Sequence, residues 1–512
     1  MTFDRNVIVI RHLLERHAAE RGAKEFASFE SGERWSYEKA LESAYRAADV
    51  LRDAGVRRND HVALLLPNGA EYLRAWFGVN ALGAVLVPIN AAYRGAMLRH
   101  VLTDSEASLV VTTPELSERI TELGLDIPIM EAKVLAEGAI REPASEGPIE
   151  AWDIHHIGYT SGTTGTSKGA VLHHAHLPGN AMMFLTWGRD DDTFLCDLPL
   201  FHSGGISMVY AALQLGARSA IRPLFSGSRY LEVVRETEAT VSLLVVGSML
   251  SFLRSQPRRP DDADTRLRWV CAAPVPEDAD DLRDRFGLES IATCFSMTEV
   301  PCPIVDWGPL RKTGSCGRLR EGFDARLVDE NDQDVLEGSP GELMIRAQAP
   351  WSIATGYYGR PEESRRAWRN GWFHTGDLLR RDAEGDYFFV DRAKDSIRRR
   401  GENISSFEVE REVRQFPGVN DAACIGVPTD YTDEDVKVFV IAADGSTIDP
   451  VALFEFLIGR MPYFMVPRFV EFVDELPRTP TMKVQKYRLR DRGHAPDVFD
   501  REAIGLTVRR DY

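Results

Sequence analysis

The 512-residue sequence has no apolar run approaching the ~20 residues of a membrane-spanning helix, so no membrane span is expected. Lysine and arginine number 61 against 78 aspartate and glutamate residues, and the resulting net charge of −17 argues against a nucleic-acid-binding surface. The six cysteines are dispersed without a CxxC pair, which indicates reduced thiols. The start lacks the apolar core of a signal peptide and the end, TVRRDY, carries no sorting signal, so we expect a cytoplasmic protein.

What the sequence does contain is an α/β pattern in a chain longer than one core usually supports. Residues 61–67 (HVALLLP) predict a buried strand, residues 69–82 a helix and residues 83–89 a second strand. Together these three elements predict a βαβ unit with a parallel sheet. Further strands are expected at four places, namely 108–113, 154–160, 241–246 and 267–272.

The pattern of predicted secondary structure changes in the last third of the sequence. From about Gly338 the strands become shorter and alternate in polarity, and beyond Lys394 a compact α+β pattern begins. This second pattern predicts helices at 407–416 and 450–460, with strands at 421–428 and 435–442. We therefore expect two domains, residues 1–392 and residues 393–512.

Residues 160–169 (TSGTTGTSKG) form a glycine-rich segment between two predicted strands. Glycines let the backbone turn tightly and expose N–H donors, while the hydroxyls and Lys168 add donors and charge, which suits a polyphosphate. A P-loop requires Gly-Lys-Ser/Thr at the start of a helix. Here Ser167 precedes the lysine and Gly169 follows it, so a P-loop nucleotidase is disfavoured, although such a segment alone is more often a plain loop.

The segment resembles the S-G-T-T-G-x-P-K-G signature of the ANL superfamily of adenylating enzymes, with Ser167 in place of proline. The resemblance is to acyl-CoA synthetases of the fatty-acid and crotonobetaine–carnitine type, and it continues in order from about residue 30 to 490. The other segments that carry it are 199–205 (PLFHSGG), 245–249 (VVGSM), 272–274 (AAP), 295–299 (FSMTE), 372–377 (WFHTGD), 385–392 (GDYFFVDR), 398–403 (RRRGEN) and 476–486 (LPRTPTMKVQK).

This resemblance implies an α/β fold with a large N-terminal domain of packed sheets plus a β-barrel, and a small mobile α+β C-terminal domain. It also implies a two-step reaction. A carboxylic acid first attacks Mg²⁺-bound ATP, giving acyl-AMP and pyrophosphate. The small domain then rotates about Lys394 and admits coenzyme A, whose thiol displaces AMP. A carrier-protein phosphopantetheine is a second possible acceptor, and the oligomeric state is left open.

The resemblance assigns catalytic roles to four residues. Lys483 bridges the phosphate oxygens, Thr298 contacts the α-phosphate, Glu299 holds Mg²⁺ and His202 lies beside the acyl pocket. Thr164 is the second residue assigned to the metal. The residues implied to bind ATP or coenzyme A are Thr160, Ser161, Gly162, Thr163, Thr164, Gly165, Lys168, Ala272, Ala273, Pro274, Phe295, Ser296, Met297, Asp377, Arg392, Lys394, Arg400, Gly401 and Glu402.

Two departures from the family pattern bear on whether the chain is catalytic. Met482 stands before Lys483, and Ser296 stands after Phe295, where the family usually has glycine. Both motivate a competing hypothesis, a non-catalytic nucleotide-binding paralogue. A ligase that loads a carrier protein and a luciferase-like oxygenase are two further candidate functions. Lys486, three residues beyond Lys483, is expected to contribute only surface charge.

Other residues bear on the substrate. The 199–205 segment has no aspartate to pair with an ammonium group, which disfavours an α-amino acid. Met249 and Met297 offer adaptable apolar surface, which favours an aliphatic or alicyclic acid. The arginines at 398–400 are either a contact for the phosphates of coenzyme A or a solvated face. The histidines at positions 155, 156, 173, 174 and 176 lack a recognisable metal-ligand spacing, so we interpret them as structural.

Overall fold

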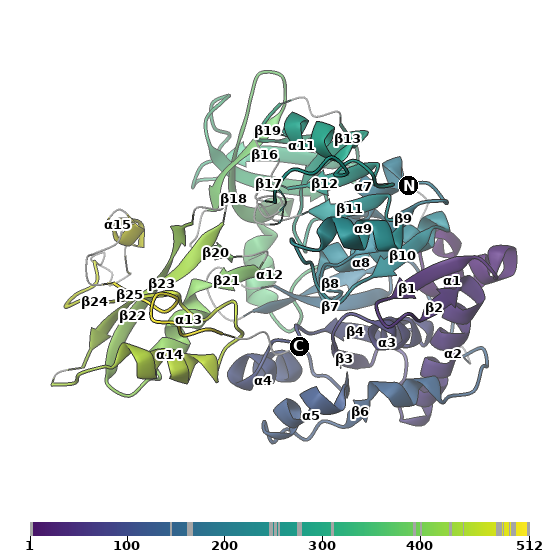
Figure 1. Ribbon diagram of the computed structural model, residues 1–512, viewed down its shortest axis with the longest axis horizontal. Helices are drawn as coiled ribbons and strands as arrows, with labels where there is room; N and C mark the ends of the chain where they lie inside the picture. Colours follow the sequence, from purple (N-terminus) through teal and green to yellow (C-terminus); the bar gives the residue numbers. More distant parts are fainter. Residues whose placement is uncertain are drawn as a thin grey trace.

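The computed structural model has a large body and a smaller one beside it, as Figure 1 shows. Among the described residues, no helix combines the length and apolarity needed to cross a bilayer. The residues that the structure describes are 4–143, 146–160, 167–244, 249, 253, 256–273, 279–308, 312–392, 396–399, 402–429, 433–443, 445–477, 484, 486–490, 492 and 498–508.

A long mixed sheet runs through the large body. Its central strands, from β1 to β13 in space, are parallel, and the strands from β14 to β16 continue the same sheet with antiparallel pairing. This antiparallel part occupies the region where the resemblance implies a β-barrel. In spatial order the strands are β16 (Phe323–Val328), β17 (Gly341–Ala347), β18 (Phe373–Arg381), β19 (Tyr387–Arg392), β15 (Ser315–Leu319), β14 (Ile304–Asp306), β13 (Ser290–Phe295), β12 (Trp269–Ala272), β11 (Val241–Leu244), β9 (Thr193–Cys196), β10 (Arg218–Ile221), β1 (Glu25–Phe29) and β2 (Arg34–Ser36).

A second sheet contains the βαβ unit expected from the sequence. Strands β3 and β4 are parallel neighbours joined by helix α3, which confirms that prediction. The strands at 108–113 and 154–160 are also confirmed, as β5 and β7. In spatial order the sheet consists of β6 (Ile129–Glu131), β5 (Leu109–Thr112), β3 (His61–Leu65), β4 (Val85–Pro88), β7 (Ile154–Thr160) and β8 (Lys168–His173).

Helices α2 and α3 show how the sequence specifies this packing. The Ser36 hydroxyl caps α2 by accepting a hydrogen bond from the amide of Lys39. On α3, a Cβ atom at Gly78 would lie 2.4 Å from the Cβ of Ala47 on α2, so only glycine permits this approach. The helices of the large body are α1 (Ile10–Arg21), α2 (Tyr37–Asp53), α3 (Ala70–Ala81), α4 (Gly95–Asp104), α5 (Pro114–Thr121), α6 (Leu177–Asn180), α7 (Met182–Trp187), α8 (Ser203–Leu215), α9 (Tyr230–Thr237), α11 (Ala279–Phe286) and α12 (Pro361–Ala367), with short 3-10 helices at Arg5–Val7, Ala132–Ala136, His174–His176 and Arg369–Gly371.

The smaller body confirms the helices and strands expected beyond Lys394. Its sheet has two apolar faces: Cys424 and its alternate neighbours pack against the helices, while Ile425 and its neighbours pack against Leu476 and Leu489. Its elements are the hairpin β20 (Ser396–Arg399) and β21 (Glu402–Ser405), the sheet strands β22 (Val419–Pro428), β23 (Glu434–Ala442), β24 (Phe469–Phe472) and β25 (Phe499–Asp500), and the helices α13 (Ser406–Val413), α14 (Pro450–Ile458) and α15 (Lys486–Arg490).

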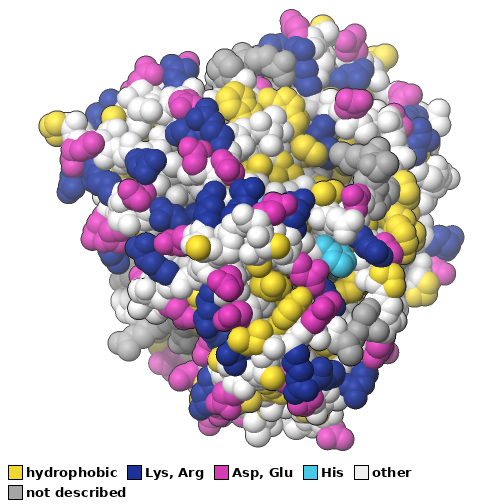
Figure 2. All heavy atoms as spheres, turned by 90° about the vertical axis from the view of Figure 1, so that its right-hand side faces the viewer, with side chains coloured by type: hydrophobic (Ala, Val, Ile, Leu, Met, Phe, Trp, Pro, Cys, Tyr) yellow, Lys and Arg dark blue, Asp and Glu magenta, His cyan; other side chains and the backbone are white. Residues whose placement is uncertain are grey.

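The two bodies are in contact. Ala92 and Met97 of the large body belong to the same apolar cluster as Phe464 and Met465 of the smaller one. The β20–β21 hairpin lies between them, and α15 lies on the outer side of the smaller body (Figure 1). On the face of the large body shown in Figure 2, basic and acidic side chains are interspersed, and the described residues form no extended basic patch there. This distribution agrees with the acidic net charge.

Candidate functional site

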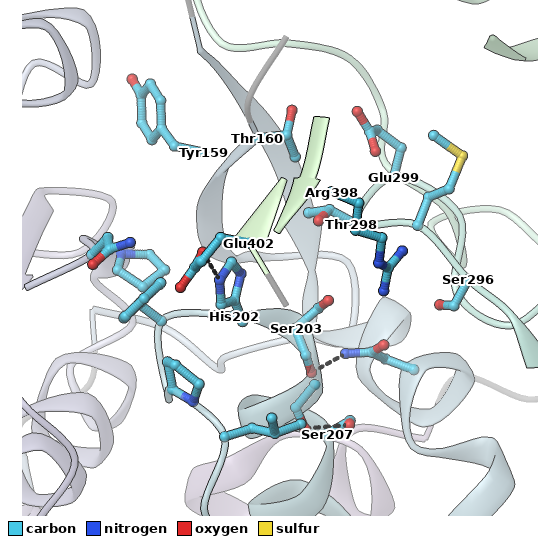
Figure 3. Close-up of a pocket in the computed structure, with 18 of the residues that line it drawn as sticks. Tyr159, Thr160, His202, Ser203, Ser207, Ser296, Thr298, Glu299, Arg398 and Glu402 are labelled. Carbon is cyan, nitrogen blue, oxygen red and sulfur yellow. Dashed lines mark hydrogen bonds and ion pairs between the residues drawn. The ribbon is translucent and has the colours of Figure 1, made fainter. Parts of the chain in front are cut away.

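A cavity of about 480 Å³ opens between the two bodies. In Figure 3, Thr160, Thr298 and Glu299 lie at one end, Ser207 lies at the other, and Glu402 lies between them. The described lining residues come from the ends of β4, β7 and β8, from the carboxyl ends of the parallel strands β9, β11, β12 and β13, from helices α4, α6, α7 and α8, from Tyr357 and β18, and from the smaller body. The cavity therefore joins segments that are far apart in the sequence.

The glycine-rich segment connects two antiparallel strands. Thr160 ends β7 and pairs in register with Lys168, which begins β8, and both residues line the cavity. The strand–loop–strand context predicted from the sequence is thus confirmed, and no helix follows the lysine as it would in a P-loop. The ammonium group of Lys168 lies 5.1 Å from the centre of the Tyr357 ring. The other residues assigned to this loop, Ser161, Gly162, Thr163, Thr164 and Gly165, lie outside the described residues.

Glu299 is buried at the same end of the cavity as Thr160, with Thr298 beside it. The hydroxyl of Tyr357 donates a hydrogen bond of 2.9 Å to Oε1 of Glu299. Burial, together with the Glu299 carboxylate, raises the pKa of Tyr357, so this hydroxyl remains a donor. A fixed carboxylate facing a polar cavity is the oxygen ligand that Mg²⁺ prefers, and Glu299 therefore fits the metal role that the resemblance implies.

Asp377 lines the cavity from the middle of β18 and is 3% exposed. Its amide donates to Thr375 Oγ1 at 3.1 Å, and that hydroxyl donates to the carbonyl of Leu343 at 2.7 Å. Arg392 is its cross-strand partner on β19, as the backbone register shows. The backbone pairing therefore sets side by side two residues that the resemblance implies to bind ATP or coenzyme A.

The residues of 272–274 and 295–297, which the resemblance implies to bind ATP or coenzyme A, are divided by the structure. Met297 and Ser296 line the cavity, and Ser296 Oγ accepts a hydrogen bond from the amide of Cys302 at 3.2 Å. Phe295 instead packs in an apolar cluster with Phe373, and it is not among the described lining residues. Ala272 is fully buried in the core. Ala273 also does not line the cavity, and Pro274 lies outside the described residues.

The segment that carries His202 is held in a fixed position. The Asn68 side chain donates to the carbonyls of Leu198 and Arg222, and its oxygen accepts from the amide of Leu200. At Gly205, a Cβ atom would lie 2.3 Å from the carbonyl oxygen of Pro199, so the glycine is required for this turn. His202 lines the cavity at the start of α8 as a result.

The smaller body supplies part of the cavity wall. His202 Nε2 lies 3.1 Å from Oε2 of Glu402 on β21, the contact drawn as a dashed line in Figure 3. A second contact between the bodies is made by Glu408 on α13, whose Oε1 accepts a hydrogen bond from the amide of Ser167 at 3.2 Å. Burial raises the pKa of Glu408 to about 7. No sequence pattern marks Glu408, because its role depends on how the two bodies meet.

The arginines at 398–400 have different surroundings. Arg398 is exposed and lines the cavity. Arg399 is buried, forms an ion pair of 2.8 Å with Asp435, and donates to the carbonyls of Phe464 and Val466. Its role is therefore structural, and it is neither a solvated charge nor a phosphate contact as the sequence led us to expect. Arg400, Gly401 and Lys394 lie outside the described residues.

Lys483 lies outside the described residues, but Val484 and Lys486 beyond it are described. Val484 joins the apolar cluster with Leu476 and Leu489. Lys486 forms an ion pair of 2.6 Å with Glu410, and its side chain is only 12% exposed. The prediction that Lys486 is a mere surface charge is therefore wrong, because this lysine neutralises a buried carboxylate.

The histidines interpreted as structural are buried together between β7, β8 and α3. His155 Nδ1 lies 2.6 Å from His156 Nδ1, and His155 Nε2 accepts a hydrogen bond from the indole of Trp76. Burial lowers the pKa values of His174 and His176 to about 3. Within the described residues, no group of three or more His, Cys, Asp or Glu side chains is arranged to hold a metal.

The fold and cavity define a two-domain α/β nucleotide-binding enzyme whose site is completed by its small domain. The AMP-binding enzyme family matches residues 14–358, and its C-terminal domain matches residues 408–483. The chain therefore belongs to the AMP-binding enzyme family, which confirms the resemblance seen in its motifs.

Individual relatives agree with this assignment. The chain is 32% identical over 485 residues to crotonobetaine/carnitine–CoA ligase of Proteus mirabilis, covering 89% of this chain and 93% of that protein. It is 36% identical over 470 residues to feruloyl-CoA synthase of an Amycolatopsis species, covering 89% and 94%. The fold is shared with o-succinylbenzoate CoA synthetase of Bacillus subtilis, with a TM-score of 0.84 and 24% identity over 94% of this chain and 98% of that one.

Proposed function

We propose that the protein is an ATP-dependent acid–thiol ligase that converts a carboxylic acid to its acyl-AMP, with release of pyrophosphate, and then to its coenzyme A thioester. The observation that carries the proposal is the single cavity that joins three chemically different regions. Glu299 and Lys168 mark a phosphate end, Asp377 marks a ribose position, and Leu243 and Met249 belong to an apolar arm that suits an acyl group. Arg398 adds a cation from the small domain.

The residues of this chain have different proposed roles in binding and catalysis. Lys168 and the glycine-rich segment neutralise the phosphates, and Asp377 accepts hydrogen bonds from the ribose hydroxyls. Glu299, oriented by Tyr357, would hold Mg²⁺, which supplies charge neutralisation at the phosphate oxygens when bound. Thr298, at the same end as Glu299, contacts the α-phosphate, and His202 lies beside the acyl group. Lys483 adds its ammonium group to the developing negative charge of the first step.

We also infer two arrangements of the small domain, residues 393–512. In the structure, the β20–β21 hairpin with Glu402 faces the cavity. Val484 packs on the opposite face of the small-domain sheet. Lys486 contacts helix α13 of the same domain. We propose that rotation of the small domain about Lys394, which lies between the two domains in the sequence, brings Lys483 to the phosphates for the first step. The observed arrangement suits the second step, in which a thiol enters beside the hairpin.

Coenzyme A is the proposed acceptor in preference to a carrier-protein phosphopantetheine, because the named relatives are CoA ligases or synthetases. The cytoplasm is the proposed location.

The decisive experiment is a panel of acids incubated with ATP, Mg²⁺ and coenzyme A. Pyrophosphate release and AMP formation should accompany thioester formation for at least one acid. Stoichiometric ADP would contradict the adenylation step. Thioester formation on a carrier protein but not on free coenzyme A would contradict the proposed acceptor alone.

A further inference from the structure

Asp197 lines the cavity together with Leu243 and Met249, the residues proposed to form its apolar arm. It directly follows β9, at the carboxyl end of the parallel strands, which is where open α/β sheets bind ligands. Because side chains alternate along a strand, Asp197 faces the same side of the sheet as Leu195, whose neighbours in register are Ser242 and Ala220. The cavity wall beside Asp197 includes four apolar residues, Leu224, Phe225, Leu243 and Met249.

The carboxyl group of Asp197 is buried without adequate pairing. Its residue is 4% exposed, and its Oδ1 atom has no hydrogen-bond partner among the described residues. The nearest cation, Arg222, donates from Nη1 to the carbonyl of Ile221 and acts on the carboxyl only at a distance. An unpaired carboxyl oxygen in an apolar setting costs free energy. A ligand group that donates a hydrogen bond to the carboxyl therefore gains more binding free energy than the same hydrogen bond would give in water.

Burial raises the pKa of Asp197 to about 7, with Arg222 opposing the shift. The other titratable groups that interact with it are Cys196 on β9 and Tyr230 on α9, and burial, with a further contribution from Asp197, raises the pKa of each. Both therefore stay neutral near pH 7. Of these three groups, Asp197 is therefore the one whose charge changes with pH near 7.

We propose that Asp197 determines substrate specificity by hydrogen bonding to a hydroxyl group at the end of the acid remote from its reacting carboxylate. The inference rests on the proposed ligase function and narrows its substrate to hydroxylated acids. A hydroxyl fits the surroundings because it brings no charge into an apolar arm and can donate to the carboxyl group of Asp197. An acid without the hydroxyl would leave this carboxyl group without that hydrogen-bond donor, which selects against that acid.

The test compares matched acids: para-hydroxylated with unsubstituted cinnamic acid, and ω-hydroxylated with unsubstituted fatty acid of equal length. We expect kcat/KM for pyrophosphate release to favour the hydroxylated member of at least one pair by roughly 10- to 100-fold. In Asp197→Leu this preference should fall to about one. Leu224→Met, which alters a neighbouring apolar side chain, should change both members of a pair by a similar factor.

The pH profile provides an independent measurement if Asp197→Leu fails to fold. A hydroxyl donor stabilises the ionised carboxylate more than the neutral carboxyl, so the preference for the hydroxylated acid should grow as pH rises through about 7. Asp197→Asn keeps the shape and an acceptor oxygen but cannot ionise. Its preference should be smaller and independent of pH between 6 and 8, whereas an unchanged pH profile overturns the proposal.

Binding separates this inference from the ligase function itself. The dissociation constants of paired acyl-sulfamoyl adenosines, with and without the hydroxyl, can be measured without turnover. A hydroxyl preference that Asp197→Leu abolishes supports the inference even if no acid is activated. The proposal is overturned if the wild type and Asp197→Leu show the same ratio. It is equally overturned if an ω-ammonium acid is preferred to the ω-hydroxy acid, because the site then selects a cation.

Discussion

The Nε2 atom of His202 lies 3.1 Å from the Oε2 atom of Glu402, so a side chain of the large domain meets one of the small domain inside the cavity. The histidine side chain is 45% exposed and that of the glutamate 11%, which places the contact at the rim of the buried region. This contact can form only while the β20–β21 hairpin faces the large domain. The His202–Glu402 contact is therefore specific to the domain arrangement proposed for thioester formation.

Separating the two half-reactions tests this contact. Glu402→Gln and His202→Asn should each slow thioester formation from supplied acyl-AMP by roughly 3- to 10-fold, a range set by the modest strength of a partly exposed pair. The double variant should lose less than the product of the two effects, because the residues act together. Glu475→Gln, an exposed change on the same domain, is the control. Independent, multiplicative losses would contradict a functional pair.

Tyr357 provides a second test, directed at the metal. Tyr357→Phe removes the hydroxyl that donates to Glu299, and a hydrogen bond to a charged group contributes about 1.5–3 kcal/mol. We expect the Mg²⁺ concentration for half-maximal pyrophosphate release to rise roughly tenfold or more. Tyr358→Phe is a matched control, since the neighbouring hydroxyl donates to Glu106 instead. Equal shifts in both variants would show that Glu299 does not need its tyrosine.

The sequence predicted the elements well where hydrophobic periodicity was strong, as for β3, α3 and β4. Motif order also predicted which residues gather at the cavity, including Glu299 and Asp377. It did not predict Tyr357, because a tyrosine outside the recognised motifs has no sequence signal that distinguishes it from a core residue. Burial and ion pairs between elements likewise depend on the three-dimensional fold, so the sequence alone does not predict them.

Asp197 illustrates the same limit. Residues 199–205 contain no aspartate, and this absence disfavoured an ammonium-bearing substrate. Two positions earlier, Asp197 lines the cavity because β9 ends directly before it. Whether a residue faces a pocket depends on where its strand ends, and strand ends are difficult to predict to within one residue.

The buried histidines predict how stability depends on pH. His174 and His176 are each 1% exposed, and burial lowers their pKa values to about 3. In the unfolded chain they would take up protons near pH 6.5, so unfolding binds protons below that value and stability falls as the pH falls. Each histidine should contribute about 1.4 kcal/mol per pH unit between about pH 6 and pH 4.

Denaturant unfolding between pH 7 and pH 5 measures this effect. His176→Asn should lower the pH dependence of the unfolding free energy by close to one proton, whatever it does to absolute stability. His12→Gln, which replaces a half-buried histidine on α1, controls for the loss of an imidazole elsewhere. The same slope in the wild type and His176→Asn would mean that His176 is protonated in the folded protein.

Lys483 is expected to act in the first half-reaction alone. Adenylation develops negative charge on the α-phosphate and the departing pyrophosphate, and an ammonium group that bridges them stabilises the transition state more than the ground state. Lys483→Ala should therefore slow acyl-AMP formation by roughly 10²–10³-fold, the usual cost of one such donor. Thioester formation from supplied acyl-AMP should stay nearly intact, because the small domain would by then have carried Lys483 away.

Lys486→Ala should behave differently, because Lys486 pairs with Glu410 at 2.6 Å and donates to Ser406 at 2.7 Å. Removing one partner of a buried pair leaves an uncompensated charge, so the unfolding free energy should fall by about 3 kcal/mol or more. Both half-reactions should decline together as the folded fraction declines. Lys133→Ala, at a side chain that is 65% exposed, serves as the surface-charge control. If a folded Lys486→Ala loses only adenylation while Lys483→Ala retains it, the catalytic lysine is Lys486, and the motif alignment across Met482 has to be moved by three residues.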